Sequence, residues 1–88
     1  MTYVETRTEA QEVLRDASRE VCYVATALIN AVSIFTRWPA YNTKTALRAD
    51  FQRLVGAYLL ANRVSGGRLS AEAEAQYERA GQAIESLK

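Results

Sequence analysis

The longest hydrophobic pattern in this chain has the period of an α-helix. Apolar residues recur every three or four positions through the first half of the sequence: Leu14, Ala17, Val21, Val24, Leu28, Ala31 and Phe35. Thr2 and Thr8 each stand three residues before a Glu or Gln, which is capping-box spacing, and neither glycine nor proline occurs before Pro39. The pattern predicts a first helix that begins between residues 3 and 8 and ends near residue 36.

A second, shorter helix is predicted after Pro39. Asn42 or Thr43 can cap a helix over about residues 44–64, and the Ser-Gly-Gly sequence at 65–67 ends it because glycine tolerates left-handed backbone angles. Its apolar stripe is narrow and consists of Leu47, Phe51, Leu54, Val55, Tyr58 and Leu59.

A third helix is predicted over about residues 71–87, with Ser70 as its cap. Its stripe consists of Ala73, Tyr77, Ala80, Ile84 and Leu87. No run has the alternation of a strand. We therefore expect one all-α domain, residues 1–88, in which two shorter helices pack on one long N-terminal helix.

The length of the first helix predicts self-association. A helix of about 30 residues extends about 45 Å, whereas a compact chain of this size has a radius of gyration near 12 Å. The first helix should therefore extend beyond its neighbours with its apolar stripe uncovered. Since a chain of 88 residues is also marginal as a monomer, we expect an intertwined dimer or a higher helical oligomer.

The segment Val21–Thr36 carries no charge. Its sixteen residues include polar ones and fall short of the about 20 apolar residues of a membrane span, so we expect it to be buried in protein and not in a membrane. The start of the chain lacks the apolar core of a signal peptide, and one cysteine, Cys22, cannot form an internal disulfide. These features favour the cytoplasm. Cys22 lies on the apolar side of the first helix, and the chain has no histidine to activate it, so we expect a buried, structural thiol.

A line of polar side chains follows the first helix opposite its apolar arc. Its members are spaced by three and four residues: Arg19, Tyr23, Thr26, Asn30, Ser33 and Arg37. A solvated helix face is usually rich in Lys and Glu, so the neutral middle of this line favours partial burial. It can be a subunit seam, the wall of a ligand pocket with an arginine at each end, a docking surface for another protein, or a polar surface without function. Tyr23 and Asn30 are its strongest contact candidates.

Trp38, Pro39 and Tyr41 gather at the connection between the first two helices. Exposed aromatic rings beside a rigid proline are typical of a protein-contact hot spot. The same residues can instead close the end of a helical bundle. The sequence leaves both interpretations open.

Positive charge is concentrated in the middle of the chain, although the net charge is only +1. Residues 37–68 hold six basic groups and one acidic group, but the arginines point in different directions around the second helix, which does not favour a nucleic-acid interface. We expect them to complement acidic side chains on the first and third helices, either within the fold or within the oligomer.

Candidate catalytic chemistry is sparse. The chain has no histidine, and no cofactor or metal motif is present. The order of a long, a shorter and a short helix resembles the all-α chorismate mutases, whose chemistry needs cations along the first helix. Because no cation lies between Arg19 and Arg37, the site that this resemblance implies is missing, and we expect no enzyme activity.

The function predicted from these observations is that of a non-catalytic helical protein that self-associates and binds, or inhibits, a larger protein. Inhibitors of host proteins encoded by phages are one class of such small chains. The alternative is an oligomeric binder of a small anion such as a nucleotide, with Arg19, Tyr23, Asn30 and Arg37 meeting at a subunit boundary.

Overall fold

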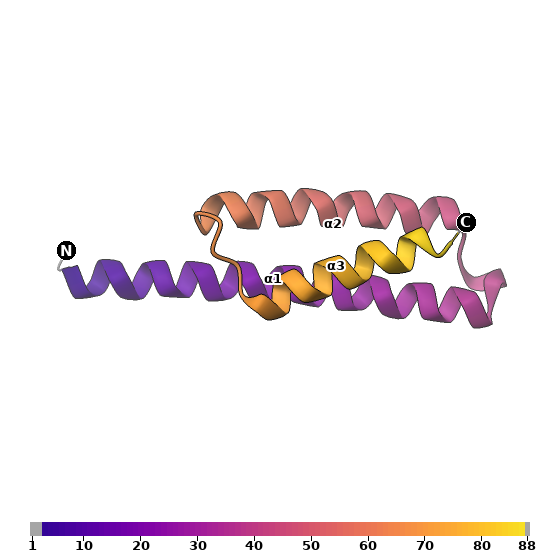
Figure 1. The fold of residues 1–88 in the computed structure, drawn as a ribbon, viewed down its shortest axis with the longest axis horizontal. Helices are drawn as coiled ribbons and strands as arrows, with labels where there is room; N and C mark the ends of the chain where they lie inside the picture. The colour runs from indigo at the N-terminus through magenta and orange to yellow at the C-terminus, as the bar shows by residue number, and fades with distance from the viewer. Residues whose placement is uncertain (1–2, 88) are drawn as a thin grey trace.

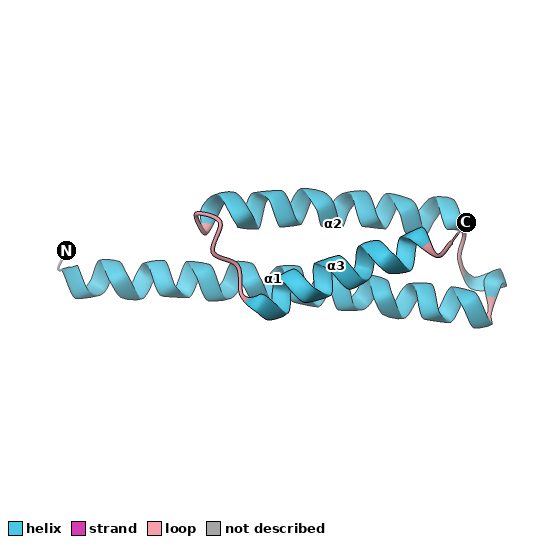
Figure 2. Cartoon of the chain, in the orientation of Figure 1, coloured by secondary structure: helices cyan, strands magenta, loops and turns pink. Residues whose placement is uncertain are grey.

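The computed structural model describes the backbone of residues 3–87 and the side chains of residues 11–87. Helix α1 spans Tyr3–Arg37, α2 spans Lys44–Val64 and α3 spans Ala71–Glu85, with a short 3-10 helix, η1, at Pro39–Tyr41. The described residues contain no strand (Figure 2), so the all-α prediction is confirmed. The third helix was predicted two residues too long, because the chain turns after Glu85. Three of the four capping-box residues, Thr2, Glu5 and Thr8, lie outside the residues whose side chains are described.

Pro39 and Thr43 set the first connection as the sequence predicts. Trp38 leaves the helical region with φ −132° and ψ 78°, as expected for a residue that precedes proline. Thr43 caps α2, since its side chain accepts a hydrogen bond from the backbone N–H of Ala46 at 3.0 Å. The chain therefore reverses direction and α2 runs antiparallel to α1 (Figure 1).

The second connection depends on glycine and on a serine of α1. Gly66 and Gly67 have φ of 67° and 78°, the left-handed region that ends α2. Ser70 then caps α3 by accepting a hydrogen bond from the N–H of Ala73 at 3.1 Å. The backbone N–H of Ser70 itself donates to Oγ of Ser18, which is only 7% exposed, at 2.9 Å. This contact fixes the start of α3 against α1.

The core lies on the inner side of α1, between α2 and α3. Its main cluster of buried residues comprises Ala25, Leu28, Val32, Leu47, Leu54, Ala80 and Leu87, and a smaller one comprises Val21, Ala61 and Ala73. Alanines at 25, 73 and 80 are completely buried, so the helices approach closely at these points. The predicted arc of α1 and stripe of α3 are therefore confirmed as the packed surfaces.

Two tyrosines join α2 to α3. The hydroxyl of Tyr58 donates a hydrogen bond to Oε2 of Glu74 at 2.7 Å, and its ring stacks on that of Tyr77 with centroids 3.9 Å apart. The hydrogen bond to the Glu74 carboxylate, together with burial, raises the pKa of Tyr58 above its ordinary value of 10.0.

The molecule is elongated, with principal extents of 55 × 18 × 17 Å and a radius of gyration of 15.4 Å. A compact chain of this length would have a radius of gyration of about 12 Å. Figure 1 shows the cause: the N-terminal part of α1 extends past the end of α2 and the start of α3. The predicted overhang of the first helix is confirmed, whereas the dimer or oligomer inferred from it stays a prediction.

Candidate functional site

A groove of about 690 Å³ lies where the connection between α2 and α3 meets α1. Eight of its lining residues come from α1 and three from the connection and the start of α3: Gln11, Leu14, Arg15, Ser18, Arg19, Cys22, Tyr23 and Thr26, with Arg68, Ser70 and Glu72. The groove follows the surface of α1 and continues past the start of α3. It is open to solvent along its length, and much of its floor is apolar.

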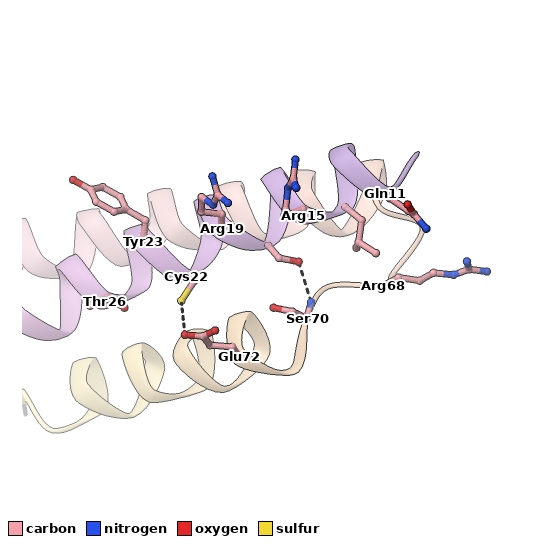
Figure 3. Close-up of a pocket in the computed structure, with 11 residues that line it drawn as sticks. Gln11, Arg15, Arg19, Cys22, Tyr23, Thr26, Arg68, Ser70 and Glu72 are labelled. Carbon is pink, nitrogen blue, oxygen red and sulfur yellow. Dashed lines mark hydrogen bonds between the residues drawn. The ribbon is translucent and has the colours of Figure 1, made fainter. Parts of the chain in front are cut away.

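Three arginines and one glutamate stand around this groove. Figure 3 shows Arg15 and Arg19 on the side of α1 away from α3, Arg68 at the end formed by the connection, and Glu72 on α3. Within the described residues, none of the three guanidinium groups forms a hydrogen bond or an ion pair. The groove therefore offers positive charge beside apolar surface, which suits an anion with an apolar portion.

Cys22 lies at the middle of the groove. Its thiol is half-buried, so the prediction of a buried cysteine is wrong, and Sγ lies 3.8 Å from Oε1 of Glu72 (Figure 3). Across the described part of the chain, no three acidic or cysteine side chains gather as metal ligands would.

The polar line of α1 is divided by the fold. Arg19, Tyr23 and Thr26 line the groove, whereas Asn30, Ser33 and Arg37 lie beyond it. A pocket wall with Arg19 at one end and Arg37 at the other is therefore not what the single chain forms. The arginines that accompany Arg19 are Arg15 and Arg68. Neither was predicted, because the return of the second connection to α1 is not visible in the sequence.

Only one member of that line is held within the fold. Thr26 is half-buried, and its hydroxyl oxygen accepts a hydrogen bond from Nε2 of Gln76 at 2.9 Å. The other five are exposed, with Tyr23 at 74%. The neutral composition of this face predicted that its residues would be partly buried. Within the single chain this holds only for Thr26.

The aromatic residues of the first connection are also exposed. Trp38 is 53% and Tyr41 is 79% accessible, and none of the residues of η1 is buried. They do not close the end of the bundle. Of the two interpretations left open by the sequence, this exposure favours the contact surface.

A second exposed apolar surface lies near the end of α2. Leu59 and Leu60 are both 59% exposed and Val64 is 54% exposed. We call these three residues the α2 patch. The prediction that Leu59 belongs to the core stripe is wrong, because α2 turns the stripe of Leu47, Leu54 and Ala61 inward and leaves Leu59 on its outer side.

Within the described residues, the arginines of α2 do not form the contacts expected of them. Arg53 pairs with Asp50 on its own helix at 3.2 Å, and Arg48 donates to the backbone oxygen of Leu87 at 3.5 Å. In the described part of the chain, no arginine of α2 forms an ion pair with an acidic side chain of α1 or α3. The prediction that these charges complement the neighbouring helices is wrong for the single chain.

No helix in the described residues is long and apolar enough to cross a membrane. The chain matches no family model, and comparisons with curated proteins and with solved structures give no match.

Proposed function

We propose that this chain is a non-catalytic helical interaction protein that self-associates through α1 and acts by binding a larger protein, which it can thereby inhibit. The observation that carries the proposal is the outer side of the uncharged segment of α1. Tyr23 and Ile34 are 74% and 49% exposed there, on a helix that has no charged residue between Glu20 and Arg37. A helix face that stays in water normally carries charges, so this composition favours contact with protein.

The α2 patch supports a separate partner surface. Leu59, Leu60 and Val64 surround Arg63, and apolar side chains around an arginine are a composition enriched at protein interfaces. This patch faces away from α1. A second copy on α1 therefore leaves it free for the larger partner. The proposed setting is the cytoplasm, where a lone half-buried thiol such as Cys22 stays reduced.

Light scattering tests self-association. We expect the wild type to exceed the monomer mass in a concentration-dependent way, and Asn30→Asp to shift it toward the monomer because it adds a charge to the uncharged face. Gln82→Glu is the matched control, since it makes the same chemical change at an exposed position of α3. A wild type that is monomeric at all concentrations would contradict self-association.

Leu60→Asp tests the partner surface. We expect a protein that binds both the wild type and Gln82→Glu not to bind Leu60→Asp, because burying a carboxylate in an apolar contact is unfavourable. Circular dichroism checks that the variant remains helical. Retention of the same partner by folded Leu60→Asp would show that the α2 patch is not the surface used.

The groove favours a second candidate function, the binding of a small anion such as a nucleotide. Arg15, Arg19 and Arg68 supply positive charge and the ring of Tyr23 supplies a stacking surface beside it. A nucleotide panel in a thermal-shift assay tests this proposal, because a ligand that binds the folded state raises its melting temperature. A rise of several degrees that disappears in Arg19→Ala would support the groove; no rise at millimolar nucleotide would contradict it.

A further inference from the structure

Six residues form a continuous line along the outer side of α1, spaced alternately by three and four positions: Glu20, Tyr23, Ala27, Asn30, Ile34 and Arg37. We call this line the outer seam. All six are exposed, and neither α2 nor α3 packs against them. Spacing of three and four is that of a helix surface that contacts a second helix along its length.

The charges of the outer seam are arranged for pairing with itself. An acidic residue, Glu20, stands at one end and a basic residue, Arg37, at the other, with no charge between them. Two copies placed in parallel would bring Glu20 against Glu20 and Arg37 against Arg37. Two antiparallel copies bring each acid against a base at both ends, which is the self-complementarity that a two-fold interface requires.

We infer that a second copy of this chain covers the outer seam, with its α1 antiparallel and in one register. In this register Glu20 faces Arg37 of the second copy, Tyr23 faces Ile34 and Ala27 faces Asn30. The small Ala27 leaves room for the Asn30 side chain, while Tyr23 and Ile34 exclude each other's exposed apolar surface from water. The inference rests on the proposed self-association and specifies the surface and geometry of it.

The same register places the exposed aromatic residues of the first connection. Helix α1 ends at Arg37, so Trp38 and Tyr41 lie just beyond the end of the outer seam. In this register they stand opposite Arg19 and Asp16 of the second copy, respectively. A guanidinium group over an indole ring is a favourable cation–π contact, and a phenol can donate to a carboxylate. Asp16 and Arg19 thus extend the contact beyond the seam.

The size of the seam sets the expected strength. Eighteen helical residues extend about 27 Å, and at a helix width of about 10 Å they cover about 300 Å² on each copy. A stable dimer usually buries about 800 Å² on each copy, so the overhang and the aromatic residues must contribute and the association should be weak, with a dissociation constant in the micromolar range.

A charge exchange at the ends of the seam tests the pairing by sedimentation equilibrium. Glu20→Arg or Arg37→Glu alone turns two attractive contacts in each dimer into two repulsive ones, and we expect each to raise the dissociation constant about tenfold. The double variant Glu20→Arg/Arg37→Glu restores both pairs and should return it to within about threefold of the wild type. Glu78→Arg, an exposed acid on α3 with the same change of charge, should leave it unchanged.

Cysteine cross-linking tests the register. Ala27→Cys and Asn30→Cys are prepared separately in a Cys22→Ser background, and each variant is oxidised alone and in a mixture. We expect the mixture to form a disulfide-linked heterodimer more efficiently than either variant alone forms a homodimer, because positions 27 and 30 face each other. A preference for 27–27 and 30–30 links would indicate a parallel pair and overturn the inference.

The remaining outcomes separate this inference from the proposed function. A wild type that dimerises but is indifferent to Glu20→Arg would overturn the outer seam and leave self-association standing through another surface. A wild type that is monomeric at all concentrations would overturn both the outer seam and self-association. The Leu60→Asp variant would still test whether a larger protein binds through the α2 patch.

Discussion

The two sides of α1 between Val21 and Thr36 differ in what covers them, although neither side carries a charge. On the inner side Val21 and Leu28 are 0% and 4% exposed, because α2 and α3 pack there. On the outer side Tyr23 and Ile34 are 74% and 49% exposed. The fold thus accounts for the apolar character of one side only, since no helix of the described residues covers the other.

Truncation of one residue on each side tests this comparison and should give the largest effect. Leu28→Ala removes buried contacts and leaves a cavity, so we expect it to lower the free energy of unfolding by about 2–5 kcal/mol. Ile34→Ala should change it by no more than about 0.5 kcal/mol. Urea denaturation at a concentration that keeps the chain monomeric measures both. Equal losses would show that the outer side is packed within the single chain.

A serine on each side sharpens the same contrast. Ser18 is buried and accepts the hydrogen bond from the N–H of Ser70, whereas Ser33 is exposed. Ser18→Ala leaves that N–H without its partner and should lower the free energy of unfolding by about 1–3 kcal/mol. The small gain in helix propensity from alanine offsets part of this loss, and Ser33→Ala has the same gain. Ser33→Ala is the matched control. Thermal unfolding measures the melting temperature of both variants. Equal melting temperatures would contradict this account.

Hydrophobic spacing predicts most of this fold because the inner surfaces of the helices repeat with helical period. It also predicts the caps at Thr43 and Ser70, since capping depends on local hydrogen bonds. The groove could not be predicted, because it arises where the second connection returns to α1 and brings Arg68 and Glu72 to residues some fifty positions earlier. Ser18, a polar residue next to Ala17 of the apolar arc and one turn before Val21, is a local signal of that tertiary contact.

The tyrosine pair between α2 and α3 gives a smaller, pH-dependent effect. Tyr58→Phe removes the hydrogen bond to Glu74 and should lower the free energy of unfolding by about 1 kcal/mol near neutral pH. Because the pKa of Tyr58 is raised in the folded state, this contribution is complete below pH 10 and is lost as the pH rises through the raised value. The difference between wild type and variant should therefore shrink above pH 10.

Tyr41→Phe is the control for this measurement, since Tyr41 is 79% exposed and its hydroxyl forms no hydrogen bond to another described residue. It should leave the free energy of unfolding of the monomer unchanged near neutral pH. Denaturation curves at several pH values compare the two variants. A Tyr58→Phe difference that is constant from pH 7 to pH 11 would contradict the role of the hydrogen bond.

The outer side of α2 offers the smallest effect and extends the comparison to a second helix. A Cβ placed on Gly56 meets no atom within 4 Å, so Gly56→Ala adds helix propensity without a clash and should stabilise the monomer by about 0.5–1 kcal/mol. Gly66→Ala, at φ of 67°, should instead destabilise it because alanine is strained there. Gly56 lies one turn before Leu59 and Leu60, on the same outer side. If Gly56→Ala stabilises the chain but weakens binding of the larger protein, that protein approaches the backbone of α2 closely at the glycine. If binding is unchanged, the contact is confined to the leucines.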